Sequence, residues 1–362
     1  MRLHARTVHL RLTEPLRISR SVMAARDAVE VTLHHDGLTG HGEAVASPYL
    51  GLPADRIRRA LAGLAPALAR LPDPETALAE LRDGAAHFES LPAGVLAAVE
   101  AALLDLAGHR AGLPVHRLLG AAAPPSTATA RTIGITPPHR AAAEAARLAA
   151  AGFTLLKVKA GSPDRADDLA RVRAVRDAAP GVRLLLDPNG GWTAEETPRL
   201  LAGFAALGVE AVEQPVAPGR PDLLAALAAR SPLPVVADED AVTHEDVLRL
   251  AGRVHGVNVK LAKCGGVTAA LRICDALQGS GTRIMLGCLT ASSLGIAPAV
   301  HLADHAHWAD LDGHLLLAHD PWRGIGGTDG TVRTGHLPGL GLHRAQPDDR
   351  VQPDDRVTDD PG

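Results

Sequence analysis

Three single carboxylates each end a short apolar run: Asp187 in LLLDPN, Glu213 in VEQP and Asp238 in VVADED. Successive members are 26 and 25 residues apart, about the length of one strand followed by one helix. Three converging carboxylates would repel one another unless a cation neutralised them, and a purely oxygen ligand set favours Mg²⁺ over zinc. Each could instead cap the helix that follows it. Their shared position predicts a Mg²⁺ site.

Lysines end two further runs: Lys157 and Lys159 in LLKVKAG, and Lys260 in VNVKLAK. Side chains alternate along a strand, so Lys157 and Lys159 are expected on the same side. Two bases with a cation between them indicate proton transfer beside a carboxylate, because Mg²⁺ would stabilise the ene-diolate that forms. Nearby positive charge would also lower the pKa of a lysine towards neutrality, as a general base requires. The alternative for a single lysine is a surface residue that extends its amine into water.

The elements that must position these groups are short apolar runs that recur every 20 to 30 residues, with amphipathic stretches between them. The eight runs span residues 128–135, 154–159, 182–187, 209–213, 234–238, 256–260, 283–287 and 308–311. Eight strands alternating with helices predict a parallel (β/α) barrel, although a doubly wound sheet has the same alternation. In a barrel the second and sixth strands lie on opposite sides. Lys159 and Lys260 would then face a central ligand from both sides, at the end where barrel enzymes build their sites.

The chain before the barrel has a different pattern. Residues 1–45 alternate like strands, with a turn at Asp36-Gly37, and residues 53–112 have helical periodicity. We therefore predict an α+β domain over residues 1–125, a barrel domain over 126–320, and a segment over 321–345 that packs back on the first domain. Residues 346–362 contain PDDRV twice and are predicted to be a disordered acidic tail without a catalytic role.

The composition excludes several functional classes. The net charge of −4 is accounted for by six Asp and two Arg in the tail, so the rest of the chain is neutral, which argues against a nucleic-acid surface. Three cysteines without a CxxC pair predict neither a disulfide framework nor a zinc site, and fit a reducing cytoplasm. No secretory signal and no apolar run of 18 residues is present. We expect a cytoplasmic enzyme with a small-molecule substrate and no membrane partner; a homo-oligomer stays open.

The motifs together resemble the muconate-lactonizing subgroup of the enolase superfamily. The subgroup pattern appears as Lys157-Val-Lys159, Asp187-Pro-Asn189, Glu213-Gln-Pro215, Asp238-Glu239 and Lys260 at successive strand ends. The resemblance implies a modified barrel of the (β/α)7β type with an N-terminal α+β capping domain. It also implies Mg²⁺ on the three carboxylates, with Asn189 and Glu239 supporting them. Lys159 and Lys260 are the implied acid and base, and Lys157 would help hold a carboxylate.

Within that subgroup the segment His307-Trp-Ala-Asp310-Leu-Asp312-Gly313 is similar to the DxD motif of dipeptide epimerases. The resemblance implies that Asp310 and Asp312 bind the α-ammonium group of a dipeptide; the alternative is a turn, since Asp-Gly before an apolar run is also a hairpin signal. Thr132 lies where the family often has a hydroxyl that contacts substrate. Lys263, three residues after Lys260, is implied not to be an acid or base.

Departures from the family pattern concern specificity. Family members that prefer an acidic C-terminal residue carry an arginine in the loop after the first strand, where this chain aligns Met23. The second specificity loop offers Tyr49, Leu50 and Leu52, and GCLTASS has Leu289 and Ala291 in place of the frequent Met and Glu. These residues predict an apolar pocket around the substrate side chains. Arg20 and Arg26 lie close enough in sequence to reach inward and would weaken that inference.

The leading hypothesis is therefore a Mg²⁺-dependent epimerase for a dipeptide with at least one apolar side chain. The alternatives on the same scaffold are N-acylamino-acid racemisation, o-succinylbenzoate synthesis and muconate cycloisomerisation, none of which needs an ammonium site. A barrel that binds a carboxylate without turning it over is the non-enzymatic alternative. In the family geometry, loops of the first domain would reach the substrate and exclude water.

Overall fold

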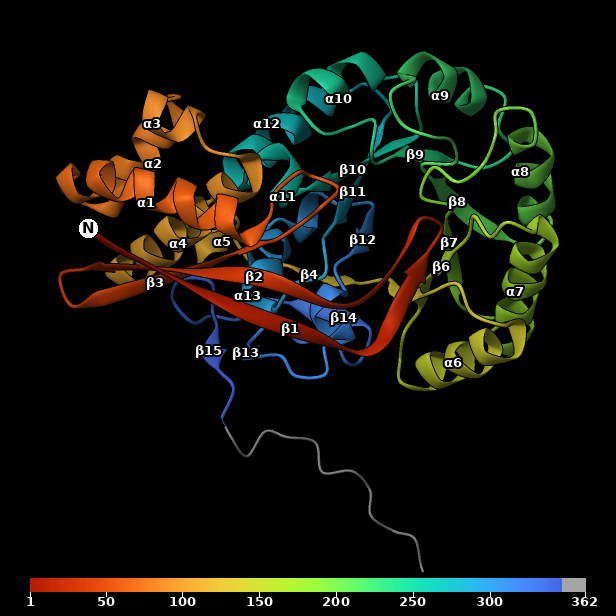
Figure 1. Cartoon of the computed structure of the whole chain (residues 1–362), viewed down its shortest axis with the longest axis horizontal. Helices are drawn as coiled ribbons and strands as arrows, with labels where there is room; N and C mark the ends of the chain where they lie inside the picture. Colours follow the sequence, from red (N-terminus) through yellow and green to blue (C-terminus); the bar gives the residue numbers. More distant parts are fainter. Residues whose placement is uncertain (347–362) are drawn as a thin grey trace, which may run out of the picture.

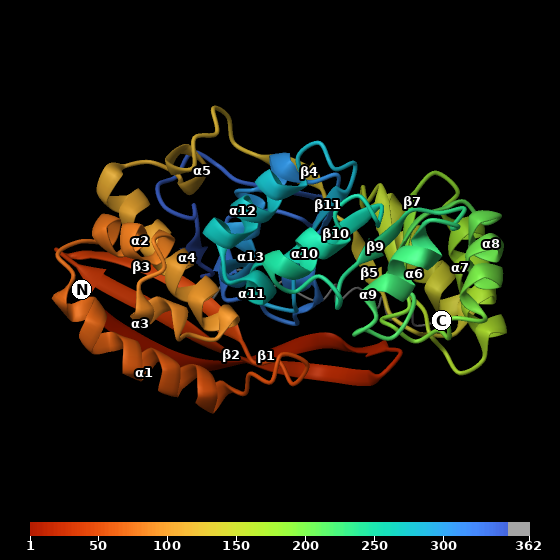
Figure 2. The same cartoon turned by 90° about the horizontal axis from the view of Figure 1, so that it is seen from above.

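A computed structural model describes residues 1–346 (Figure 1). Apart from Gln346, the predicted acidic tail lies outside the described residues. Within the described part of the chain, no helix is long and apolar enough to cross a membrane. A capping domain and a barrel lie side by side, and the β1–β2 hairpin extends from the first to the second (Figure 2).

The capping domain begins with an antiparallel sheet in the order β1-β2-β3. Its strands are β1 (Arg2–Ile18), β2 (Ser21–His35) and β3 (Leu38–Val45), and its helices are α1 (Ala54–Arg70), α2 (Pro74–Arg82), α3 (Ala86–Glu89), α4 (Ala93–Ala111) and α5 (Val115–Leu118). The predicted turn at Asp36-Gly37 is confirmed, with φ of 48° and 77°. Helix α4 packs on β3 at Gly40 and Gly42, where a Cβ atom would lie 2.2 and 2.0 Å from carbonyl oxygens of α4. Only glycine permits this approach.

The barrel is one sheet of eight parallel strands in the order β12-β11-β10-β9-β8-β7-β6-β5. The strands are β5 (Arg131–Ile133), β6 (Leu155–Lys159), β7 (Arg183–Asp187), β8 (Val209–Glu213), β9 (Val235–Ala237), β10 (Gly256–Lys260), β11 (Arg283–Gly287) and β12 (Trp308–Asp310). The first and last strands meet where Ala130 N donates to Ala309 O at 2.8 Å. The predicted parallel barrel is confirmed, and a doubly wound sheet is excluded.

Helices cover the outside of the barrel sheet (Figure 1). They are α6 (Pro138–Ala150), α7 (Arg165–Ala178), α8 (Thr197–Ala205), α9 (Pro221–Ala228), α10 (His244–Leu250), α11 (Leu261–Cys264), α12 (Val267–Leu277) and α13 (Ser293–Val300), with 3-10 turns η1 (Ala303–His305) and η2 (Gly313–Leu316). The barrel interior is filled by a separate cluster that includes Leu155, Leu185, Met285 and Trp308. Because the interior is packed, a ligand can enter only at a mouth.

The segment after the barrel forms β13 (Trp322–Arg323), β14 (Thr331–Arg333) and β15 (His343–Arg344); β14 pairs with β4 (Ser126–Ala128). Its contacts with the capping domain centre on Glu30, a buried carboxylate of β2. Arg344 forms an ion pair with Glu30 at 2.8 Å, and Trp322 Nε1 donates to it at 3.1 Å. Through Trp322 and Arg344, the segment therefore contacts the first domain at Glu30.

The β1–β2 hairpin carries the capping domain to the barrel mouth (Figure 2). Its pairing shifts register between Arg11 and Leu16, beyond which the strands continue to the tip at Ser19 and Arg20. Arg17 O accepts a hydrogen bond from Ile135 N at 2.8 Å, just after barrel strand β5. The hairpin tip is therefore anchored to the barrel.

Candidate active site

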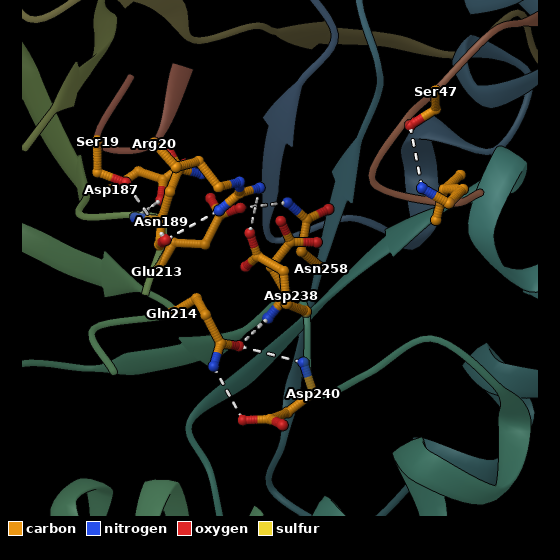
Figure 3. Close-up of polar contacts among 12 residues, drawn as sticks. Ser19, Arg20, Ser47, Asp187, Asn189, Glu213, Gln214, Asp238, Asp240 and Asn258 are labelled. Carbon is orange, nitrogen blue, oxygen red and sulfur yellow. Dashed lines mark hydrogen bonds and ion pairs between the residues drawn. The ribbon is translucent and has the colours of Figure 1, made fainter. Parts of the chain in front are cut away.

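The three predicted metal carboxylates lie at consecutive strand ends and are almost fully buried (Figure 3). Asp187 ends β7, Glu213 ends β8, and Asp238 directly follows β9. The next helices begin at Thr197, Pro221 and His244, and their N-cap positions are occupied by other residues. The carboxylates therefore do not cap these helices, and the alternative interpretation as caps is wrong.

Lys157 is the most deeply buried of the predicted lysines, with 1% of its surface exposed. Its Nζ lies 2.5 Å from Glu213 Oε2, 2.7 Å from Asp310 Oδ2 and 3.1 Å from Asp187 Oδ2. Burial alone would lower the pKa of Lys157, but these three carboxylates raise it well above its usual range. Lys157 is consequently a permanent cation at the floor of the site.

Lys159 and Lys260 are the two lysines predicted to be acid and base. Lys159 Nζ lies 2.5 Å from Asp187 Oδ2, and Lys260 Nζ lies 2.7 Å from Asp238 Oδ2. Three strands separate β6 from β10 in either direction around the barrel, so the two amines approach the cavity from opposite sides. Burial would lower the pKa of Lys260, but Asp238 and Glu213 outweigh it and raise that pKa. The lowering of a lysine pKa by a bound cation stays a prediction.

The carboxylates themselves titrate in opposite directions. Burial raises the pKa of Glu213 to about 7 against the opposing effect of Lys157, and the neighbouring Asp187 and Asp238 raise it further. Burial also disfavours ionised Asp238, but Lys260 and Lys263 outweigh it and hold its pKa well below the usual range. Burial is therefore the main cause of the raised pKa of Glu213, and Lys157 and Lys260 oppose it.

The donor set fits a hard divalent cation in its chemistry. All three side chains offer carboxylate oxygens, and Glu213 Oε2 has an ion pair but no hydrogen bond of good geometry. Among residues 1–346, no three His, Cys, Asp or Glu side chains already converge closely enough to hold an ion; lysine amines lie between the acids instead. Asp187, Glu213 and Asp238 would hold the ion after a shift of these lysines.

Asn189 and Glu239, the predicted supporting residues, both contact the site. Asn189 donates to Asp187 through its backbone N at 2.8 Å and its Nδ2 at 3.1 Å. Glu239 faces the cavity and pairs with Arg20 at 2.9 Å. Sequence reasoning missed Asn258, which is fully buried and donates to Glu213 Oε1 at 2.9 Å. It lies two residues before Lys260, so strand alternation could have placed it on the same face.

Asp310 and Asp312 both line the cavity, but their partners differ. Asp310 Oδ2 accepts a hydrogen bond from Lys157 Nζ, whereas the buried Oδ1 of Asp310 has no hydrogen-bond partner. Asp312 accepts from Thr132 N at 2.7 Å and pairs with Arg131 at 3.2 Å. The chain continues into η2 rather than a β-hairpin, so the hairpin that Asp-Gly could have signalled does not form. Thr132 is placed in the cavity wall, as predicted, while Arg131 was missed.

The cavity at the barrel mouth has a volume of about 430 Å³. The capping domain contributes Met23, Arg20, Arg26 and Tyr49 to its wall, and the barrel contributes Leu289 among others. Leu50 does not line the cavity; it packs against the capping-domain core. Its neighbour Tyr49 lines the cavity in its place.

Arg26 is the cationic group of the wall that lacks an acidic partner. Its Nη1 donates to Ala46 O at 3.2 Å and its Nη2 contacts Met23 Sδ at 3.1 Å, while its buried Nε has no partner. In residues 1–346, no carboxylate lies within ion-pair distance of Arg26. The wall therefore combines apolar groups with one unneutralised guanidinium.

Lys263 is the remaining site residue whose importance the sequence signalled indirectly. The chain has only four lysines against 33 arginines, and all four lie at this mouth. Lys263 Nζ donates to Asp238 O and Asp238 Oδ1, each at 2.6 Å. An ammonium differs from a guanidinium in size and proton exchange, so a chain that otherwise uses arginine retains lysine where those properties matter.

The fold and site define a barrel enzyme with a capping domain and two opposed lysines beside buried carboxylates. Residues 140–346 match the family described as enolase C-terminal domain-like, and residues 2–120 match the mandelate racemase / muconate lactonizing enzyme N-terminal domain. The chain belongs to the mandelate racemase / muconate lactonizing enzyme family of the enolase superfamily. It is an isomerase of the racemase and epimerase class, and the non-enzymatic alternative is not favoured.

Named relatives extend over nearly the whole chain. A hydrophobic dipeptide epimerase of Roseobacter litoralis is 34% identical and covers 94% of this chain and 98% of its own. The substrate-liganded L-Ala-D/L-Glu epimerase of Bacillus subtilis superposes with a TM-score of 0.87 at 29% identity, over 96% and 99% of the two chains. A dipeptide epimerase of Methylococcus capsulatus, complexed with Mg and L-Arg-D-Lys, has a TM-score of 0.86 at 34% identity, over 94% and 98%.

Proposed function

We propose that this protein is a Mg²⁺-dependent dipeptide epimerase that inverts the α-carbon of the C-terminal residue. The observation that carries the proposal is the pair Lys159 and Lys260, which approach one cavity from opposite sides of the barrel. Inversion requires a proton to leave on one face and return on the other, and two amines meet that requirement. The three named relatives are all dipeptide epimerases.

The proton moves between the substrate α-carbon and a lysine Nζ on each face. One lysine must be neutral to accept the proton, while the other must be protonated to return it. A bound Mg²⁺ would supply positive charge that neutralises the carboxylates and the charge developing on the substrate carboxylate. Lys157, buried and cationic, contributes to the same stabilisation from the floor of the site.

The substrate ammonium is assigned to Asp310. Asp310 lines the cavity and its buried Oδ1 has no hydrogen-bond partner, whereas Asp312 already pairs with Arg131 and Thr132. A buried acceptor without a donor is unfavourable, so an ammonium hydrogen bond at Oδ1 would be strong. Racemisation of N-acylated amino acids and the other reactions of the subgroup lack this ammonium, and the relatives do not favour them.

The hairpin tip is assigned the exclusion of water. Arg20 Nη1 donates to Asn189 O at 2.9 Å and its Nη2 pairs with Glu239, so the tip closes over the metal carboxylates. Its guanidinium lies over the ring of Tyr49 from the second loop, 5.2 Å from the centroid. Water kept away from the cavity would strengthen each electrostatic contact with the reacting carboxylate.

Side-chain preference is proposed to be for apolar residues, supported by Met23 and Leu289 in the cavity wall. Arg26 favours a second candidate, a dipeptide with an acidic side chain, because a buried guanidinium without a carboxylate partner can bind one from the substrate.

Purified protein with Mg²⁺ in D₂O should incorporate deuterium at one α-carbon of its substrate. Apolar, acidic and basic dipeptides are compared by mass spectrometry, with chelated protein as control. No exchange in any dipeptide, from folded metal-bound protein, would sink the proposal.

We further propose a cytoplasmic location. Cys264, Cys274 and Cys288 are free thiols, and Cys274 and Cys288 are raised in pKa by burial, which keeps them protonated. Free thiols are typical of reducing compartments. Fractionation of the source cells, followed by immunodetection, tests the location; recovery in an extracellular fraction would contradict it.

A further inference from the structure

Gln214, which directly follows Glu213, has an unusual backbone. Its φ is 37°, and it is one of three non-glycine residues with positive φ in residues 1–346. Another is Asn189, two residues after Asp187. This region is disfavoured for residues with a side chain and persists where the surroundings enforce it. Two of the three cases therefore adjoin carboxylates of the proposed metal site.

The peptide groups of Gln214 join the neighbouring strand ends. Its N–H donates to Val236 O in β9 at 2.8 Å, and its carbonyl accepts from Gly190 N, in the turn after β7, at 2.7 Å. The residue thus connects the turn that follows Asp187 with strand β9, which directly precedes Asp238. The positive φ is what permits both bonds at once, because it turns the chain between them.

The side chain of Gln214 is fully buried and all of its hydrogen-bonding capacity is used (Figure 3). Its Oε1 accepts from Asp238 N at 3.0 Å and from Asp240 N at 3.3 Å. Its Nε2 donates to Val216 O at 3.0 Å and to Asp240 Oδ2 at 2.9 Å. The amide therefore holds the backbone of Asp238 directly.

Asp240 helps to fix which way the amide points. The backbone donors Asp238 N and Asp240 N require the amide oxygen, the acceptor Val216 O requires the NH₂ group, and Asp240 Oδ2 accepts the second N–H of that group. The other oxygen, Asp240 Oδ1, accepts from Gly219 N at 2.6 Å and anchors the carboxylate. The Gln214–Asp240 pair is consequently a rigid support behind the strand ends.

We propose that Gln214, oriented by Asp240, is a positioning residue that sets the relative placement of Asp187, Glu213 and Asp238 for Mg²⁺. Gln214 does not touch the reacting atoms and acts through the backbone of the three strand ends. The proposal rests on the proposed function, in which these carboxylates bind the ion. Partners that orient metal ligands in this way strongly affect metal affinity.

The first experiment uses Gln214→Leu, which removes all four side-chain hydrogen bonds without changing the charge. Mg²⁺ binding is measured by calorimetry on the full chain without dipeptide. The Kd should rise roughly 10–100-fold, with a fall in kcat and a smaller change in the KM for dipeptide. A Kd equal to that of the parent protein would overturn the proposal. Should this variant not fold, Asp240→Asn, which retains Gln214, must still raise the Kd, and an unchanged Kd would overturn it.

A polarity exchange separates geometry from charge. Gln214→Glu alone sets two carboxylates against each other. Gln214→Glu with Asp240→Asn, at the parent net charge, restores a donor and an acceptor between the two side chains, although the bond to Val216 O stays lost in both variants. The double variant should bind Mg²⁺ more nearly like the parent than Asp240→Asn alone. Equal affinity in both variants would overturn the orienting role of Asp240.

Glu30→Gln is the matched control. Glu30 is equally buried and hydrogen-bonded, but it lies in β2 and pairs with Arg6 and Arg344. It should lower the Tm without changing the Mg²⁺ Kd, which distinguishes loss of stability from loss of positioning. If the parent protein binds no Mg²⁺, the proposed metal site fails. If the parent binds and Gln214→Leu binds equally well, only the positioning role fails.

Discussion

The barrel mouth and the tip of the β1–β2 hairpin line the same cavity, but they are held differently. At the mouth, Lys157 and its three carboxylate partners are buried, with Nζ to oxygen distances between 2.5 and 3.1 Å. At the tip, the side chain of Arg20 is 42% exposed and Val22 is 64% exposed. Bonds between charged groups in a low-dielectric interior are stronger than the same bonds near water.

This difference suggests a division of labour. In the proposed mechanism the mouth would fix the groups that move the proton, whose positions must be exact to within a fraction of an ångström for chemistry to occur. The β1–β2 hairpin would contact the variable part of the substrate. The following predictions test that division.

The largest effect is expected for Lys260→Ala and Lys159→Ala. Each removes the acid or base on one face, so epimerisation should fall by roughly 10²–10⁴-fold. Deuterium exchange should survive from only one epimer, a different one in each variant, because the remaining lysine still reaches its own face. Exposed Arg58→Ala on α1 is the control. Equal exchange from both epimers in both variants would show that the lysines do not divide the two faces.

The joint between the two domains should respond to pH. Glu43 of β3 accepts from Ser292 N at 2.8 Å, and burial raises its pKa from 4.5 to about 7. A group whose pKa is higher in the folded than in the unfolded protein stabilises the fold fully at pH values below its unfolded pKa. That contribution to the free energy of unfolding is lost as the pH rises through the folded pKa. The free energy of unfolding should therefore fall between pH 5 and 8, by up to about 3 kcal/mol.

Glu43→Gln should remove that dependence. Denaturant unfolding of the two proteins at pH 5, 6, 7 and 8 isolates the contribution of Glu43, since all other groups are common to both. The free energy of unfolding of the variant should depend less on pH than that of the parent protein. Parallel curves would mean that Glu43 does not titrate between its unfolded and folded values.

At the mouth, Asp310→Asn tests the ammonium contact. It removes a charged acceptor, so the KM for a dipeptide should rise about 10–100-fold, in line with the loss of a charge-assisted hydrogen bond. An N-acetylated dipeptide, which has no ammonium, is the comparison substrate and should lose far less. If the KM rises equally for both substrates, Asp310 acts through Lys157 and not through the substrate ammonium.

The smallest effect is expected in the β1–β2 hairpin, at Arg26 of β2. Arg26→Met should lower kcat/KM for acidic dipeptides and raise it for apolar ones, in each case by a few-fold and up to about tenfold. Single-turnover exchange with the preferred substrate should stay close to that of the parent. A fall of the same size with every dipeptide would contradict a role confined to specificity.

Much of the barrel and of its chemistry could be predicted from sequence. A barrel strand lies at each position where we predicted a strand ending in a lysine or a metal carboxylate. These strands could be predicted because a short apolar run bounded by a polar residue is a local signal. The missed residues have no such signal. Gln214 and Asn258 lie inside predicted motifs, but their roles depend on which backbone groups another strand presents to them.

The sequence by itself determined the order and spacing of lysines and carboxylates around a parallel barrel, since strand alternation and one βα unit per carboxylate fix both. Only the tertiary structure decided their partners. It placed Lys157 among three carboxylates, which raise the pKa of this lysine. It also put Tyr49 rather than Leu50 in the wall and left Arg26 unpaired there, because the hairpin approaches the mouth through packing between distant segments that no local pattern encodes.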